Sequence, residues 1–226
     1  ISARTTNKFI VNSMYSLAQL YEKLGNYTSA VTYYDELLAY YKDDPLGPKA
    51  QWRIGICYFN LKEYDSAVLE LSDPLIKNLS TSEQHEVNYF LANAFVRLKE
   101  YKNALSIYEE ILQNDLTPDF KEKVLYSQAW VNFQLGNYEK SFDIFDGINK
   151  NYDDSLAVNA LFWSGEAKRY LGDTKTANEI FKIFVEKYPS SILASRAQFS
   201  MGTIYYTTDN SGDAEKSLLN ASVSND

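Results

Sequence analysis

An internal repeat is the feature that most constrains what this sequence can fold into. Four segments superpose without a gap when they are aligned from Leu17, Ile54, Leu91 and Gln128. Two weaker copies begin at Ser164 and Met201, so that every step is 36 or 37 residues. Self-similarity at this period is typical of chains that stack one supersecondary unit many times.

Two columns of small residues run through the six copies. The first column contains Ala18, Gly55, Ala92, Ala129, Gly165 and Gly202. The second column, twelve residues later, contains Ala30, Ala67, Ala104, Ser141, Ala177 and Ala214. Small side chains let two helices approach closely, and a Leu at such a contact typically costs about 1–3 kcal/mol. We therefore expect both columns to mark helix crossings within and between the units.

Each unit is predicted to be a pair of antiparallel helices. Leu17, Leu20 and Leu24 fall at i, i+3 and i+7, which is the apolar stripe of an amphipathic helix. A short break follows, and three of the units have Gly there, which takes a positive φ without cost. Lys62 and Lys99 occupy the same place in two other units. We expect either a strained lysine or a different local turn there.

The second helix of each unit begins near an aromatic residue, and prolines separate the units. It is predicted to end near Tyr41, Asn78, Asn114, Asn149 and Tyr188 in the first five units. Pro74 falls inside the second helix of the second unit and should kink or delay it. The last ten residues, SLLNASVSND, look shorter than the other second helices, and no polar capping helix follows them.

The sequence therefore predicts an all-α fold, a single α-solenoid of about six helix hairpins with a period of 36–37 residues. The expected units are residues 9–45, 46–82, 83–119, 120–155, 156–192 and 193–226. One unit cannot bury its own apolar stripe, so neighbouring units supply the core. Because the sequence does not begin with Met, we expect it to be part of a longer protein.

Composition excludes several classes of function. The chain has 22 Lys and Arg against 30 Asp and Glu, a formal charge of −8, which disfavours nucleic acid as the main partner. A single cysteine, Cys57, and a single histidine, His85, predict no disulfide, no metal site and no cofactor. We expect no membrane span, and we find no phosphate-binding loop or nucleophile motif. The chain is therefore predicted not to be an enzyme.

The repeated residues resemble the tetratricopeptide repeat, or TPR, over essentially the whole chain. The resemblance lies in the run LGNYTSAVTYY at residues 24–34, in the paired small columns and in FVEKYPSS at residues 184–191. It implies a right-handed superhelix. The lengthened links and the segment at residues 187–206 resemble bacterial cell-envelope members, the outer-membrane assembly lipoproteins and the Tol-Pal-associated proteins. That resemblance implies a periplasmic or cell-envelope location, with the cytoplasm as the alternative.

In a TPR-like array the first helices line one concave face, and three columns there predict a peptide-binding groove. An aromatic column precedes the first small column by three residues. Two further columns lie four and seven residues after the aromatic column. This spacing places the three columns on one helical face. The aromatic candidates are Tyr15, Trp52, Phe59, Tyr89, Tyr126, Trp130, Phe133, Phe162, Phe199 and Tyr206. Each of them either contacts a ligand or packs against its neighbours, and Trp130 is the first choice for substitution.

Basic residues share this face. The candidates are Lys49, Arg97, Lys123, Arg169 and Arg196. A basic groove on an acidic chain favours acidic segments of other proteins. The lysine clamp with which chaperone-binding TPR domains hold a terminal carboxylate is not matched, because Tyr15 occupies its leading position.

The preferred hypothesis is a non-enzymatic scaffold that binds peptide or helix segments of other proteins in an aromatic groove. The alternative is a structural unit that assembles with itself, end to end or through its uncapped C-terminal unit. Apolar surface left open at that end motivates the alternative.

Overall fold

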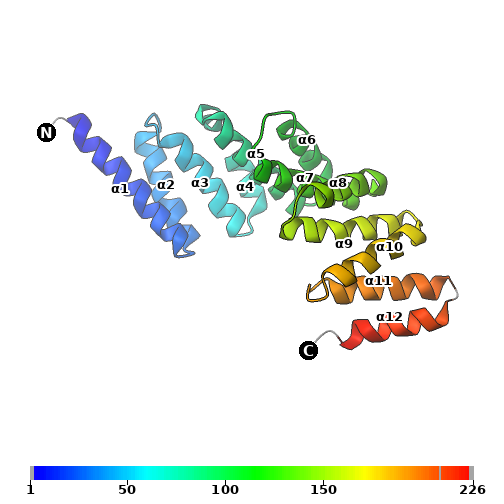
Figure 1. Cartoon of the computed structure of the whole chain (residues 1–226). Coiled ribbons are helices and arrows are strands. Elements are labelled where there is room, and N and C mark those ends of the chain that lie inside the picture. Colours follow the sequence, from blue (N-terminus) through cyan, green and yellow to red (C-terminus); the bar gives the residue numbers. More distant parts are fainter. Residues whose placement is uncertain (1–2, 209, 224–226) are drawn as a thin grey trace. The chain divides into compact units, whose positions relative to one another are not determined.

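The computed structural model describes residues 3–208 and 210–223, and these residues contain α-helices, one short 3₁₀ helix and no strand. The predicted all-α helical repeat is confirmed. The chain divides into two compact units, Ile1–Gln113 and Asn114–Asp226. Each unit contains three of the predicted hairpins, and consecutive helices of a unit pack against each other (Figure 1).

The first unit consists of six α-helices and the 3₁₀ helix. They are α1 (Ala3–Lys23), α2 (Tyr27–Tyr41), α3 (Gly47–Asn60), α4 (Tyr64–Leu71), η1 (Pro74–Asn78), α5 (Thr81–Arg97) and α6 (Tyr101–Ile111). The second unit also has six α-helices. They are α7 (Pro118–Gln134), α8 (Tyr138–Asn151), α9 (Ser155–Tyr170), α10 (Thr174–Lys187), α11 (Ala194–Thr207) and α12 (Ser211–Val223).

The turn inside the hairpins repeats in its hydrogen bonds. In the first hairpin the Gly25 N–H donates to the Glu22 carbonyl at 2.9 Å, and the Asn26 N–H donates to the Tyr21 carbonyl at 2.9 Å. These are the two bonds of a Schellman motif, which ends one helix while a residue with positive φ redirects the chain. Equivalent pairs of bonds close the α3, α5, α7 and α9 helices.

The residue at the centre of this turn has a positive φ whether or not it is glycine. Gly25, Gly136 and Gly172 have φ between 73° and 81°. Lys62 and Lys99 have φ of 65° and 63°. Of the two expectations for these lysines, the first is therefore confirmed: the turn is unchanged, and each lysine has a strained backbone conformation.

Both columns of small residues are buried, and the glycines show why. A Cβ added to Gly55 on α3 would lie 2.5 Å from Leu71 Cδ2 on α4. A Cβ added to Gly165 on α9 would lie 2.6 Å from Phe181 Cε1 on α10. The two columns also meet directly, since the Ser141 hydroxyl donates to the Ala129 carbonyl at 2.9 Å. The small residues thus allow the two helices of a hairpin to cross closely.

Three local expectations were wrong. Leu20 and Leu24 are exposed rather than part of a buried stripe, because no hairpin in the described residues packs on that side of α1. The second helix of the second hairpin ends at Leu71 and not near Asn78, although Pro74 does interrupt the helical segment as expected and starts the separate 3₁₀ helix. The α12 helix, with 13 residues, is longer than α4 and α6, and residues 224–226 lie outside the described residues.

Candidate interaction groove

In the first unit, the predicted groove aromatics pack against other rings of the same unit. The Tyr15 ring lies edge-on to Tyr34 with centroids 5.4 Å apart. Phe59 contacts Phe90 in the same way at 5.9 Å. Tyr89 lies 6.0 Å from the buried Tyr108. Most of the area of these rings is therefore used by the fold itself.

Trp52 also belongs to the core of the first unit. It packs against a buried cluster that includes Leu71, Ile76 and Val87. Its indole Nε1 is buried and has no hydrogen-bond partner among the described residues. Trp52 therefore contributes apolar packing at the junction of α3, η1 and α5.

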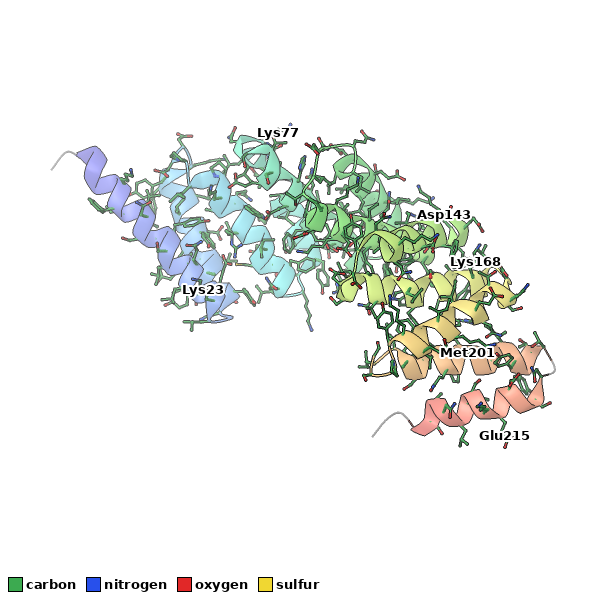
Figure 2. The ribbon with its side chains drawn as sticks, viewed as in Figure 1. Lys23, Lys77, Asp143, Lys168, Met201 and Glu215 are labelled. Atoms are coloured by element: carbon green, nitrogen blue, oxygen red, sulfur yellow. The ribbon has the colours of Figure 1, made fainter. Side chains whose placement is uncertain are left out.

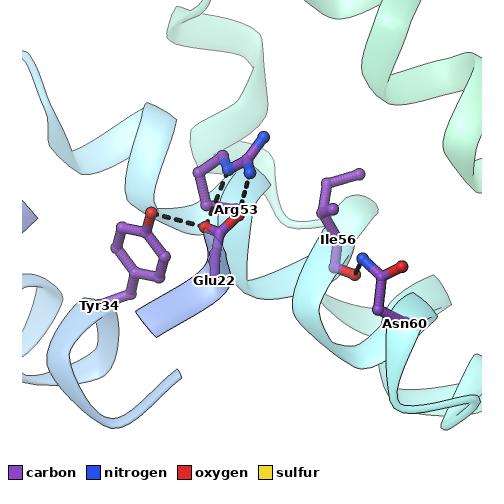
Figure 3. A network of polar contacts seen from close by, with 5 residues as sticks. All are labelled: Glu22, Tyr34, Arg53, Ile56 and Asn60. Atoms are coloured by element: carbon purple, nitrogen blue, oxygen red, sulfur yellow. Dashed lines mark hydrogen bonds and ion pairs between the residues drawn. The ribbon is translucent and has the colours of Figure 1, made fainter. Parts of the chain in front are cut away.

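A buried carboxylate in the first unit is held by three donors (Figure 3). The Tyr34 hydroxyl donates to Glu22 Oε1 at 2.6 Å, and the Arg53 Nε donates to the same oxygen at 2.9 Å. The Arg53 Nη2 pairs with the other oxygen, Oε2. Burial and the bond to Glu22 raise the pKa of Tyr34. Burial opposes the charge of Arg53, but the hydrogen bond and charge of Glu22 outweigh it and raise the pKa of that guanidinium.

The two basic candidates of the first unit differ. The Lys49 ammonium pairs with Glu83 at 2.9 Å. Hydrogen bonds from Lys49 and Ser80 lower the pKa of Glu83 to about 2. Arg97, at the end of α5, is exposed. The first unit therefore offers one basic candidate already bound to a carboxylate and one on the surface.

In the second unit, Tyr126 and Trp130 also lie against the core. Tyr126 lies edge-on to the buried Phe145 at 5.4 Å. Trp130 is half-buried on the cluster that Phe145 forms with Ile148 and Ala160. Neither residue lines the groove described below.

An open groove of about 890 Å³ is formed within the second unit. Most of it lies between α9 and α11, on which Lys168 and Met201 are labelled in Figure 2. It is lined by Phe133, Phe162, Trp163, Glu166, Arg169, Tyr170, Ile192, Ser195, Arg196, Phe199, Ser200, Leu218, Ala221 and Ser222. Five of the predicted candidates thus meet in one place, and they are Phe133, Phe162, Arg169, Arg196 and Phe199.

The aromatic side chains of this groove form a connected set. The Phe133 ring lies edge-on to Trp163 at 5.3 Å and to Tyr170 at 5.2 Å. Phe162 contacts Trp163 at 5.5 Å and is only 1% exposed, so it forms the floor. Phe199 is 57% exposed and has no ring contact among the described residues. The groove therefore presents apolar area that the fold does not use.

The charged groups of the groove are arranged in two ways. Glu166 accepts hydrogen bonds from Arg169 Nη2 at 2.7 Å and from the Ser200 hydroxyl. Burial opposes the charge of Arg169, yet its bonds to Glu166 raise the pKa of the guanidinium. The Arg196 guanidinium lies 5.4 Å from the centroid of Phe162 and 5.8 Å from that of Trp163. It makes no ion pair within residues 3–208 and 210–223.

The remaining candidates lie apart from the groove. Lys123 on α7 and Tyr206 on α11 are exposed and do not line it. Reasoning from the sequence missed Trp163 and Tyr170. Trp163 occupies a column that contains serine in three copies, Arg53 in another and an aromatic residue, Phe90, in only one, so the pattern does not distinguish it. Tyr170 shares its column with charged and polar residues such as Lys23, Arg97 and Gln134, so the repeat pattern does not indicate an aromatic residue there.

Comparison with sequence families identifies the repeat. Models of the tetratricopeptide repeat match residues 15–74, 85–117, 123–155 and 159–191, which together are well over half of the chain. The chain belongs to the tetratricopeptide repeat family. No curated protein matches this TPR chain. The cell-envelope branch suggested by the link lengths is not identified by these matches.

Solved structures of other TPR proteins share the fold. A TPR protein from Parabacteroides merdae is 14% identical with a TM-score of 0.76, and the match covers 96% of this chain and 80% of that one. The C-terminal part of a TPR protein from Cytophaga hutchinsonii is 14% identical with a TM-score of 0.74, covering 92% and 77%. YrrB, described as a TPR protein with an unusual peptide-binding site, is 17% identical with a TM-score of 0.63, covering 83% and 90%.

The described helices also bear on membrane and metal binding. None of these helices is both long and apolar enough to cross a lipid bilayer. Among the described residues, no three His, Cys, Asp or Glu side chains gather as metal ligands. Cys57 is buried, and burial raises the pKa of its thiol to about 12.

Proposed function

We propose that this TPR chain is a non-enzymatic scaffold whose second unit binds peptide or helix segments of other proteins. The single observation that carries the proposal is the open groove of about 890 Å³, in which the rings of Tyr170 and Phe199 are exposed to solvent. Membership of the TPR family supports it, because such repeats generally mediate contacts between proteins.

The aromatic side chains supply the binding free energy. Tyrosine, tryptophan and phenylalanine give large, stiff contact areas, and such residues dominate interfaces between proteins. Phe199, Tyr170 and Ile192 are all exposed at the groove. When a segment binds there, apolar surface of each side chain is removed from contact with water, which favours binding. Phe133 lies edge-on to Tyr170, and the buried Phe162 forms the floor of the groove.

A random library of twelve-residue peptides displayed on phage is the probe that tests the proposal. Peptides selected on the chain are synthesised, and their Kd values are measured by fluorescence anisotropy. Phe199→Ala should weaken binding by about 1–3 kcal/mol, because it removes an exposed aromatic ring from the lining of the groove. The matched control is Ile183→Ala, which removes an equally exposed apolar side chain from α10.

The expected outcome is a raised Kd for Phe199→Ala and an unchanged Kd for Ile183→Ala, with the helical signal in circular dichroism intact for both. Two outcomes contradict the proposal. One is that no peptide is enriched over a selection on an unrelated helical protein. The other is that Phe199→Ala and the control bind equally well.

A second candidate function is self-assembly, and one observation favours it. Leu20 and Leu24 on α1 and Leu219 on α12 are exposed apolar side chains at the first and last described hairpins. Large exposed apolar areas commonly mark interaction sites. Under this alternative, light scattering shows a mass that rises with concentration, and Leu20→Glu with Leu24→Glu abolishes the rise. A constant monomer mass would remove self-assembly as the main role.

The cell-envelope location stays a prediction. Fractionation of the source cells with an antibody against the chain tests it, and recovery in the cytoplasmic fraction would contradict it.

A further inference from the structure

We infer that the groove of the second unit selects segments in which an apolar side chain stands next to a carboxylate, and that Arg196 binds the carboxylate. The inference rests on the proposed function and adds the chemistry of the partner. It draws on the different situations of the two arginines in the groove.

Arg169 already has a carboxylate partner. Its Nε and Nη2 donate to Glu166 Oε2 at 3.1 and 2.7 Å. Glu166 is buried and also accepts a bond from Ser200, so this carboxylate is held from two helices. Removing Arg169 from Glu166 would leave a buried charge without its partner, which is costly. Arg169 is therefore part of the wall and does not provide a free cation.

Arg196 is the cation that a partner can use. It is exposed and forms no ion pair in the part of the chain that the structure describes. Its guanidinium lies over Phe162 and Trp163, and both rings belong to the groove. A guanidinium stacked on aromatic rings keeps the N–H donors at its edge, where they match the two oxygens of a carboxylate.

The charge balance of the groove favours the same partner. Its lining contains two arginines and one glutamate, and no other Lys, Asp, Glu or His. The groove therefore has a formal charge of 2 − 1 = +1, whereas the whole chain carries −8. A local positive site on an acidic protein both attracts a carboxylate and discriminates against a neutral segment.

The apolar half of the partner is set by the neighbours of Arg196. Phe199 follows it by less than one turn of α11 and is exposed, and Ile192 precedes the helix and is exposed as well. An apolar side chain beside the carboxylate would cover these groups. The adjacent low-dielectric rings also strengthen the ion pair relative to one in open water.

The carboxylate can come from an Asp or Glu side chain or from the C-terminus of a partner chain. Both share the chemistry that Arg196 recognises, and the experiment separates them. Peptides selected from the random library are synthesised in two ways. In one arm Asp and Glu are replaced by Asn and Gln, and in the other the peptide ends in a free acid or an amide.

The Kd values of these peptides are measured for the unmodified chain and for Arg196→Gln, Arg196→Lys and the control Arg97→Gln, an exposed arginine of α5. For the unmodified chain, one of the two arms should show that the peptide with the carboxylate binds about 10-fold more tightly than the peptide in which an amide replaces it. The arm that shows this difference identifies the source of the carboxylate. Arg196→Gln should reduce that ratio to below about twofold, and Arg196→Lys should keep part of it. Arg97→Gln should leave the ratio unchanged.

The outcomes separate this inference from the proposed function. Equal binding of the acid and amide forms, or a ratio that survives Arg196→Gln, overturns the inference while the groove still binds peptides. A selection that enriches no peptide contradicts the proposed function and this inference together. Thermal melts of Arg196→Gln by circular dichroism confirm that the variant is folded when its ratio is measured.

Discussion

The two units share their turns and their small-residue columns, but the side chains on the face that forms the groove differ between them. In the first unit, Arg53 reaches Glu22 on α1 and closes a network with Tyr34. In the second unit, the repeat column of Arg53 contains Ser127, Trp163 and Ser200, and the Ser200 hydroxyl donates a hydrogen bond to Glu166 on α9. The short serine satisfies the carboxylate and occupies little space. The comparison teaches that the side chains on a common scaffold decide whether the face is filled or open.

The largest expected effect comes from breaking the network of the first unit. Arg53→Ala should destabilise the chain by about 3 kcal/mol, because it leaves the buried Glu22 carboxylate without its cation. Ser200→Ala, in the same repeat column of the second unit, should cost only about 1 kcal/mol, since Arg169 still pairs with Glu166. Urea unfolding followed by circular dichroism measures both. Equal costs would contradict the contrast between the units.

Overpacking should affect both units alike. Gly55→Leu in the first unit and Gly165→Leu in the second should each cost about 1–3 kcal/mol, because a Cβ already lies within 2.6 Å of a facing side chain. The control is Gly147→Leu on α8, where an added Cβ meets nothing within 4 Å. Thermal unfolding compares the three variants. A tolerated Leu at either Gly55 or Gly165 would show that the small columns are not close helix contacts.

A pH dependence is expected from the second unit. Glu122 on α7 is 4% exposed, and its Oε1 has no hydrogen-bond partner among the described residues. Burial and the nearby charge of Asp154 raise the pKa of Glu122 to about 7. Asp154 itself accepts hydrogen bonds from the Ala157 and Leu156 N–H groups, which lower its pKa. The equivalent position in the first hairpin is the apolar Val11.

The raised pKa of Glu122 in the folded state determines whether stability rises or falls with pH. The folded chain binds this proton more tightly than the unfolded chain, whose Glu titrates near about 4.3. The resulting stability is full below that pH and is lost as the pH rises through about 7. Glu122→Gln should therefore be more stable than the original chain at pH 8, by on the order of 1 kcal/mol, and similar at pH 4. Urea unfolding at the two pH values tests this, and a gain that is independent of pH would contradict it.

The smallest effect concerns the turns that the units share. Lys99→Gly should stabilise the first unit by about 0.5–1 kcal/mol, because a lysine with a φ of 63° is strained and glycine is not. Gly136→Ala should destabilise the second unit by a similar amount, since the same turn there has a φ of 79°. Thermal melts measure both changes. Opposite signs are expected, and a destabilised Lys99→Gly would show that the lysine side chain supports the turn.

Periodic features were predictable from the sequence, and features that depend on neighbouring helices were not. The hairpins, the close contacts at Gly55 and Gly165 and the turns follow from residue types that recur at a fixed spacing. Phe162 and Phe199 occupy the same column, yet one is buried and the other is exposed. Leu20 and Cys57 share another column, and there Leu20 is exposed whereas Cys57 is buried. In both cases burial is set by the helix that packs alongside, which a repeat pattern does not record.

We propose that partners bind the second unit, because the groove aromatics of the first unit pack against rings of the same unit. Photo-cross-linking tests this most directly. A selected peptide with a benzophenone at its N-terminus is irradiated with the full chain, and the cross-linked residues are identified by mass spectrometry. The account predicts cross-links within residues 162–170 and 192–200. Cross-links concentrated in residues 52–59, or on α10, which does not line the groove, would contradict it.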